Sequence, residues 1–198
     1  RNQALMRKKA KLILFTAMMV VVTIILQEPA KNPSQSYGEA QIGGAFTLTD
    51  HMGKRVSNEN LKGRFSLIFM GYSNCPDICP ATLAVISDTL KKLGNDAEKV
   101  HAVFISVDSK NDSPEKLSQY LKSFDPRIIA LTGSEEEVKA ILAAYKGYAK
   151  QPENAAPGNN LISHSGFVYV MDKEGKYIRH FDNSVKSDVL VEALKAVF

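Results

Sequence analysis

The sequence lacks the features that would place it in several large classes of protein. It has no internal repeat and no low-complexity tract, and it has no glycine-rich loop that could cradle a phosphate group. An excess of one charge is also missing. The net charge is +4 and the chain after its basic start is nearly balanced, so nothing indicates a nucleic-acid-binding surface. Cysteine is scarce as well, and any thiol chemistry must use the only two, Cys75 and Cys79.

What is present indicates one globular domain behind a tail. The chain has 198 residues, of which 44% are hydrophobic, and this is ample material for a single core. Changes of composition divide the sequence into four segments. We predict a basic flank at 1–11, an apolar membrane segment at 12–26, a polar linker at 27–44 and the folded domain at 45–198.

The apolar segment, 12–26, follows the basic flank and contains no charge. Its length lies between that of a signal-peptide core and that of a full membrane span. No small-x-small cleavage site follows it, which favours an uncleaved anchor over a cleaved signal, and no cysteine follows it, which excludes a bacterial lipoprotein anchor. The basic side should stay in the cytoplasm or the mitochondrial matrix, so the domain should face the periplasm or the intermembrane space. Either compartment permits disulfides.

The order of apolar periodicities predicts an α/β fold. Strands and helices alternate through the middle of the chain, so consecutive strands should pair in parallel through helical crossovers, and a final hairpin should add an antiparallel edge. This order is typical of a thioredoxin-like three-layer sandwich with a mixed central sheet. The predicted strands are a hairpin at 46–57, then 65–70, 100–107, 128–131, 166–171 and 177–181, and the predicted helices are 80–94, 113–124, 134–145 and 186–198.

The two cysteines fall in the loop between a buried strand, 65–70, and the helix that Pro80 should open. Cys79 would then cap that helix, where the helix dipole would lower the pKa of a thiol. The four-residue separation allows the two thiols either to form a disulfide or to present two thiolates to a metal. A static disulfide is the alternative, although closing so small a loop removes little chain entropy.

His164 is the histidine best placed to complete a site with the cysteines. It ends a long polar loop and precedes a strand, which in a thioredoxin-like fold is a position that faces the reactive loop. His101 should be a satisfied histidine in a buried strand, and His51 should be solvated at a hairpin tip. His180 lies in a predicted strand and is expected at the surface or in the core rather than in a metal site.

A set of two cysteines and one histidine matches copper(I) best, because thiolate selects copper(I) and imidazole also accepts copper(II). Zinc in a structural site would need a fourth protein ligand, and none is evident. Asp77, between the cysteines, is expected to lie behind the ligands or in solvent. The carboxylates of Asp108 and Asp112 could make the electrostatic potential near the site more negative, or they could equally cap a helix or lie on the surface.

The segment from Tyr72 to Pro80, with the letters YSNCPDICP, resembles the signature of the SCO/SenC family, copper-binding assembly factors for cytochrome c oxidase. The resemblance covers about residues 44–198, and the predicted N-terminal span also fits that family. The further matching segments are FISVD at 104–108, DSP at 112–114, His164 leading into an apolar strand, and DKEG at 172–175.

The resemblance implies that Cys75, Cys79 and His164 are copper ligands, and that the copper is delivered to the binuclear copper centre of the oxidase subunit that carries it. It further implies a role in reducing that subunit's cysteines. The implied partners are this subunit, a copper donor or thiol reductant, and the membrane. Two positions depart from the family pattern: Ser163 stands where many members have an acid, and Ser109 stands where a proline is common.

Three functions follow from these residues. A metallochaperone, which binds copper and hands it over without catalytic turnover, is favoured. A thiol–disulfide oxidoreductase acting on an exported or membrane partner would use the same cysteines, but thioredoxin-type reductases have two residues between their cysteines and this motif has three. A peroxidase of the peroxiredoxin type lacks its expected Pro-x-x-x-Thr/Ser-x-x-Cys arrangement.

Overall fold

The computed structural model describes residues 41–151 and 161–198, and the fold in these ranges is built around a mixed sheet of seven strands. The strands of this sheet are β1 (Thr47–Asp50), β2 (Arg55–Ser57), β3 (Phe65–Gly71), β4 (Val100–Ser106), β5 (Ile128–Thr132), β8 (Val168–Met171) and β9 (Tyr177–Phe181). Their order across the sheet is β2-β1-β5-β4-β3-β8-β9. The central strands β5, β4 and β3 pair in parallel, and a hairpin joins each side antiparallel.

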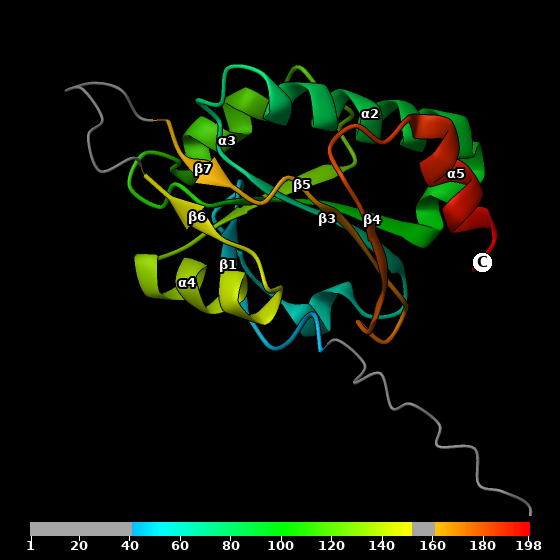
Figure 1. Cartoon of the computed structure of the whole chain (residues 1–198), viewed down its shortest axis with the longest axis horizontal. Helices are drawn as coiled ribbons and strands as arrows, with labels where there is room; N and C mark the ends of the chain where they lie inside the picture. Colours follow the sequence, from blue (N-terminus) through cyan, green and yellow to red (C-terminus); the bar gives the residue numbers. More distant parts are fainter. Residues whose placement is uncertain (1–40, 152–160) are drawn as a thin grey trace, which may run out of the picture. The chain divides into compact units, whose positions relative to one another are not determined.

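Helices cover both faces of this sheet, as Figure 1 shows. The α-helices are α2 (Ile78–Leu93), α3 (Pro114–Leu121), α4 (Glu135–Ala144) and α5 (Ser187–Lys195), and two short 3₁₀ helices are η1 (Asn58–Leu61) and η2 (Gly94–Lys99). In the figure α2, α3 and α5 lie on one side of the sheet and α4 lies on the other. The predicted thioredoxin-like α/β sandwich with a mixed sheet is therefore confirmed.

The central parallel strands are largely buried on both faces, which explains why their sequences are mostly apolar. All seven residues of β3 are buried, and Leu67 and Phe69 have no exposed surface. A strand covered on both faces has no solvent side, so it does not alternate between apolar and polar residues. Each large side chain buried in this way stabilises the fold by roughly 1.5–3 kcal/mol relative to leaving it exposed.

The helix ends follow local chemistry in two cases that the sequence predicted. Ser134 and Glu137 form the capping box of α4, in which the hydroxyl of Ser134 accepts from the backbone N–H of Glu137 and the carboxylate of Glu137 accepts from that of Ser134. Gly94 ends α2 with a φ of 57°, a left-handed value that suits glycine. The other predicted bounds differ from the observed ones by about three residues or fewer, which is ordinary at helix and strand ends.

The predicted start of α2 is wrong by two residues. The helix begins at Ile78 with Asp77 at its N-cap, so Cys79 lies inside the first turn and Pro80 follows it. Proline is tolerated throughout the first turn, because the first N–H groups of a helix have no carbonyl partner. Pro80 in the sequence therefore predicts the first residue of the helix only to within one turn.

A second, two-stranded sheet was not predicted. It consists of β6 (Ala149–Lys150) and β7 (Ser163–His164), which pair antiparallel with Ala149 opposite His164. Strands of two residues carry no apolar periodicity, and the two partners are separated in sequence by a long polar stretch. His164 belongs to β7, which Figure 1 labels, so this ladder positions the residue.

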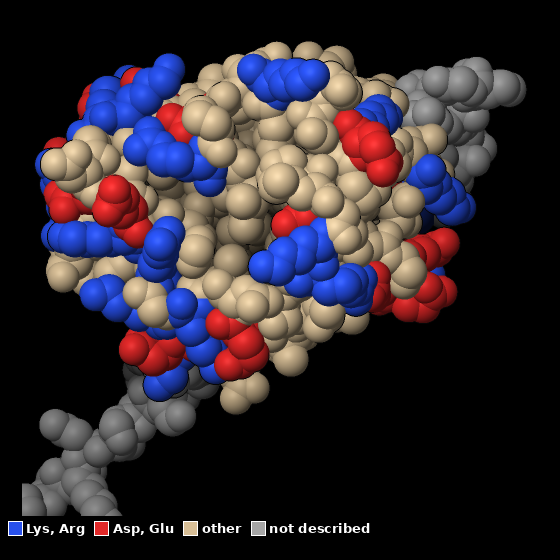
Figure 2. Space-filling view, turned by 180° about the vertical axis from the view of Figure 1, so that it is seen from behind, with Lys and Arg blue, Asp and Glu red and all other residues tan. Residues whose placement is uncertain are grey.

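The predicted basic flank, the apolar segment at 12–26 and most of the linker lie outside the described residues. Within the residues that the structure describes, no helix is both long enough and apolar enough to cross a membrane. The domain surface is of mixed charge. Figure 2 shows basic and acidic side chains interspersed over the face seen from behind, with uncharged areas between them, in agreement with the expected balance of charge.

Candidate metal centre

The structure brings together the three side chains that the sequence predicted. The thiol sulfurs of Cys75 and Cys79 and a ring nitrogen of His164 all lie within 4.8 Å of one another. The Sγ atom of Cys79 is 3.4 Å from Nε2 of His164, although the two residues are 85 positions apart in the sequence. All three side chains are buried, with exposed fractions of 9%, 0% and 7% respectively.

The cysteines are held by the turn that connects β3 to α2. The backbone N–H of Cys75 donates to the carbonyl of Tyr72 at 3.2 Å, and this bond closes the turn after β3. Cys79 projects from the first turn of α2 into the core. Cys79 is therefore fixed by a helix of the central layers, whereas Cys75 is held by the turn between β3 and α2.

Gly71 makes the approach of Cys79 to the sheet possible. A Cβ atom at position 71 would lie 2.6 Å from Sγ of Cys79 and 2.9 Å from the ring of Phe104, both far inside contact distance. Gly71 was not singled out from the sequence. A glycine at the end of a buried strand is a signal of close approach by another group, and it could have been read as such.

The imidazole of His164 is oriented by its own backbone surroundings. Its Nδ1 lies 3.0 Å from the carbonyl oxygen of Ser165, so Nδ1–H donates there and Nε2 is left as the acceptor nitrogen, directed at Sγ of Cys79. Tyr72 packs edge-on against the ring at 5.7 Å between centroids, and Phe69 does so at 6.4 Å. Burial lowers the pKa of His164, so the ring is held in the neutral form that can bind a metal.

The predicted lowering of a thiol pKa is wrong for Cys79. Burial raises the pKa of this thiol far above its ordinary value, and a backbone hydrogen bond at Tyr72 opposes the shift only in part. Cys75 and the carboxylate of Asp112 raise it further. Desolvation of the thiolate thus outweighs the helix dipole, because Cys79 lies inside the first turn and has no exposed surface. A cation that enters the site must displace the proton of Cys79.

Of the three acids near the cysteines, one lies in solvent and two are buried. Asp77 is exposed at the N-cap of α2, which agrees with a solvated acid. Asp108 and Asp112 are buried, with exposed fractions of 4% and 1%, so the surface alternative is wrong for both. Among the residues described, Cys75, Cys79 and His164 form the only group of three metal-binding side chains, and no acid joins them.

The other histidines do not contribute to this group. His51 is not simply solvated, because its Nδ1 accepts from the backbone N–H of Ala130 at 3.2 Å. His101 lies half-buried in β4, where burial and then the charge of Arg64 lower its pKa. His180 is exposed in β9 and hydrogen-bonded to the hydroxyl of Tyr177 at 2.6 Å.

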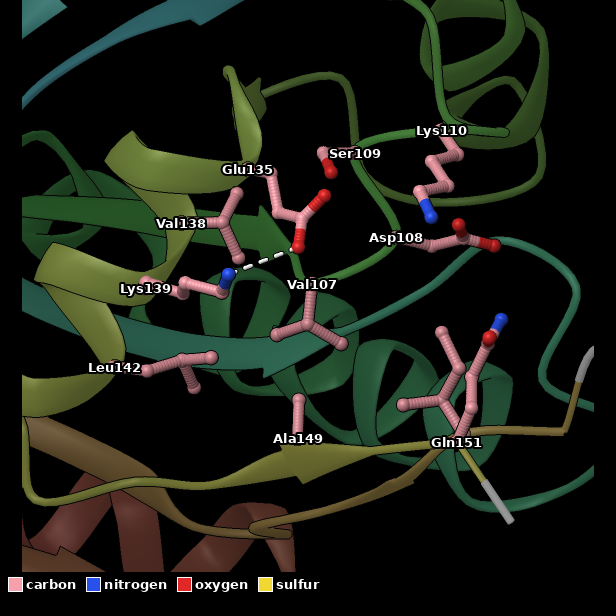
Figure 3. A pocket seen from close by; sticks show the side chains of 11 residues that line it. Val107, Asp108, Ser109, Lys110, Glu135, Val138, Lys139, Leu142, Ala149 and Gln151 are labelled. Atoms are coloured by element: carbon pink, nitrogen blue, oxygen red, sulfur yellow. Dashed lines mark ion pairs between the residues drawn. The ribbon is translucent and has the colours of Figure 1, made fainter. Parts of the chain in front are cut away.

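A pocket lies beside the ladder that carries His164, but it is separate from the three donor atoms. Figure 3 shows that it is lined by Val107 after β4, by Val138 and Leu142 of α4, and by Ala149 of β6. Glu135 and Lys139 form an ion pair of 2.9 Å there. Asp108 and Lys110 also line the pocket, but its described side chains include no group of three metal-binding residues.

The fold and the three donors together define a thioredoxin-like domain with a buried dithiol–imidazole group. The chain belongs to the SCO1/SenC family, whose model matches residues 34–198. It is 40% identical over 164 residues to "Protein sco1" of Schizosaccharomyces pombe, an alignment covering 81% of this chain and 62% of that protein.

Two solved structures show the same fold. ScoI of Bradyrhizobium japonicum, determined with copper bound, is 39% identical and superimposes with a TM-score of 0.74 over 79% of this chain and 99% of that one. BsSco, described as a member of the Sco family of cytochrome c oxidase assembly proteins with a disulfide switch, is 28% identical with a TM-score of 0.67, over 80% and 95% of the two chains. The alignments span only 62% of the length of the Schizosaccharomyces pombe protein and 58% of that of "Protein SCO2, mitochondrial" of Saccharomyces cerevisiae, which is 38% identical over 175 residues.

Proposed function

We propose that this protein binds copper through Cys75, Cys79 and His164 and passes it to the binuclear copper centre of cytochrome c oxidase during assembly of that enzyme. The observation that carries the proposal is the convergence of two sulfurs and one imidazole nitrogen within 4.8 Å in a buried site. Copper bound to ScoI, and the oxidase-assembly role stated for BsSco, support the choice of metal and recipient.

The chemistry of the donors favours copper(I) as the ion delivered. Two thiolates are soft ligands, and three protein ligands suit copper(I), whereas structural zinc sites use four. The hydrogen bond from Nδ1 of His164 to Ser165 fixes the tautomer that offers Nε2. Because the Cys79 thiol holds its proton strongly, copper uptake releases protons and is favoured as the pH rises.

The partners of this function follow from the chemistry of uptake and release. We infer a copper donor or thiol reductant upstream and the copper-centre-bearing subunit of the oxidase downstream. Residues 12–26 serve as a membrane anchor that keeps the domain in the periplasm, or in the intermembrane space of a mitochondrion. Fractionation of cells that express the full chain tests the anchor: the protein should remain with the membranes after a high-salt wash.

Removal of His164 gives the most specific test of the copper site. In the His164→Ala variant we expect the copper(I) affinity, measured by competition with a chelator of known affinity, to fall roughly 100-fold or more, since loss of even an outer-shell partner costs 10–100-fold. Oxidation of Cys75 and Cys79 to a disulfide should still occur. His180→Ala, which removes an exposed histidine outside the site, should bind copper like the unchanged protein.

A thiol–disulfide oxidoreductase is the second candidate, because two free thiols lie within 4.8 Å of each other in one site. This function would use the same cysteines and would not need His164. Catalytic reduction of a disulfide substrate by the His164→Ala variant, at the rate of the unchanged protein, would favour it over copper delivery.

A further inference from the structure

Asp112 is a buried acid that contacts the loop carrying the cysteines, yet it is not one of the three donors. It precedes α3 and is 1% exposed. Burying a carboxylate costs folding free energy unless its oxygens accept several hydrogen bonds. The groups that donate to Asp112 or pair with it come from separate parts of the fold.

The first connection is to the cysteine loop itself. Asp112 accepts the backbone N–H of Ser73 at 2.8 Å on one oxygen and the hydroxyl of Ser73 at 2.5 Å on the other. Ser73 lies two residues before Cys75, in the turn that follows β3. This two-point contact fixes both the position and the direction of the backbone immediately before the first sulfur.

The second connection is to the framework. The hydroxyl of Ser106, at the end of β4, donates to Asp112 at 2.6 Å, and the ammonium of Lys116 in α3 lies 3.3 Å away. β4 is the parallel neighbour of β3 and Ser106 is entirely buried. Asp112 therefore joins the cysteine loop to a rigid central strand and to the start of a helix.

We propose that Asp112 is a positioning residue for the metal site, which holds the Cys75 side of the loop at the correct distance from Cys79 and His164. Cys79 needs no such support, because it belongs to α2, and His164 is held by β7. Cys75 lies in an irregular turn, and of the three donors it depends most on contacts made by its neighbours. The inference rests on the proposed function and adds a residue that the donor set does not include.

Asp108 provides a matched control in the same connection between β4 and α3. It is also buried, with 4% exposure, but both of its side-chain oxygens accept from Asn111, within the same connection. Replacing Asp108 therefore removes a buried carboxylate of similar surroundings without loosening the cysteine loop.

The test compares Asp112→Ala, Asp112→Asn and Asp108→Ala in the full chain. We expect Asp112→Ala to lower the copper(I) affinity about tenfold, as loss of an outer-shell partner does. Asp112→Asn should restore most of it, because the amide oxygen can still accept from the backbone of Ser73. Asp108→Ala should bind copper normally. Ser73→Ala, which keeps the charge of Asp112 and loses only one bond to the loop, gives a second test if Asp112→Ala does not fold.

A second readout needs no copper. Amide hydrogen exchange at Ser73–Cys75 in the metal-free protein should become faster in Asp112→Ala and stay unchanged in Asp108→Ala. Unaltered exchange and affinity in both Asp112→Ala and Ser73→Ala would overturn the inference, as would equal losses in Asp108→Ala. If the unchanged protein bound no copper while the exchange pattern held, the positioning role would stand and the proposed function would fall.

Discussion

The contact between Gly71 and Cys79 is so close that it should not tolerate a single methyl group. In Gly71→Ala the new Cβ would lie 2.6 Å from the sulfur and 2.9 Å from Phe104, so either the strand or the first turn of α2 must move. We expect the free energy of unfolding to fall by about 1–3 kcal/mol, the usual cost of overpacking a core. Copper(I) affinity should fall with it, because the displaced atom is a donor.

Urea unfolding and chelator competition measure these two effects. Gly44→Ala is the control, since a Cβ there would meet only the methyl group of Ala144 at an ordinary 3.4 Å. A Gly71→Ala variant as stable as the unchanged protein would show that the close approach of Cys79 to the sheet is not a constraint.

His101 should make the domain less stable in mild acid. Burial, and to a smaller extent Arg64, lower its pKa in the folded protein, so the unfolded chain takes up a proton at higher pH than the folded one does. The stabilisation is complete above the unfolded pKa of about 6.5 and is lost as the pH falls toward the folded value. His101→Gln lacks this pH-dependent contribution to the free energy of unfolding, because glutamine does not titrate.

Urea unfolding of both proteins between pH 8 and pH 5 measures the difference. We expect the stability of the unchanged protein, relative to His101→Gln, to decline as the pH falls through about 6.5. A difference that stays constant over the whole range would contradict the assignment of this pH dependence to His101.

At the residue scale the sequence predicted the members of the site but not their surroundings. Cys75, Cys79 and His164 could be selected by their chemistry and by their places beside strands and a helix. The raised pKa of Cys79 could not be foreseen, because it depends on burial among side chains from distant parts of the chain. The burial of Asp112 was missed for the same reason: its partners lie in two other segments.

At the scale of single elements, α4 depends on its capping box. In Ser134→Ala the N–H of Glu137 loses its acceptor, so we expect the free energy of unfolding to fall by about 1 kcal/mol. Copper(I) affinity should not change, since α4 supplies no donor. The control is Lys139→Ala in the same helix, which removes an exposed ion pair of small worth. Equal stability of Ser134→Ala and the unchanged protein in urea would contradict the role of the cap.

The elements that the sequence predicted well are those whose formation is decided locally. β3 and β4 have mostly apolar sequences, and α4 begins with a recognisable capping box, so each could be placed within a few residues. The β6–β7 ladder could not, because its pairing is decided by the rest of the fold. Yet this ladder places His164, so the least predictable element supplies one of the three donors.

At the scale of the whole molecule, the topology explains how residues 85 positions apart come to share a site. β3 lies between β4 and β8, so the turn after β3 and the segment that leads into β8 lie at neighbouring places in the sheet. The sequence predicted the parallel centre and the antiparallel final hairpin, and the thioredoxin-like order predicted that His164, just before a strand, faces the cysteine loop. The pairing of the first hairpin, β1–β2, with β5 was not predicted, because no sequence signal names the strand that an edge hairpin joins.

X-ray absorption at the copper edge, on the full chain loaded with one equivalent of copper(I), identifies the atoms that bind the copper. We expect two sulfur neighbours and one nitrogen neighbour for each copper, and loss of the nitrogen in His164→Ala. A copper bound by sulfur alone in the unchanged protein, with a spectrum that His164→Ala leaves unaltered, would contradict this expectation.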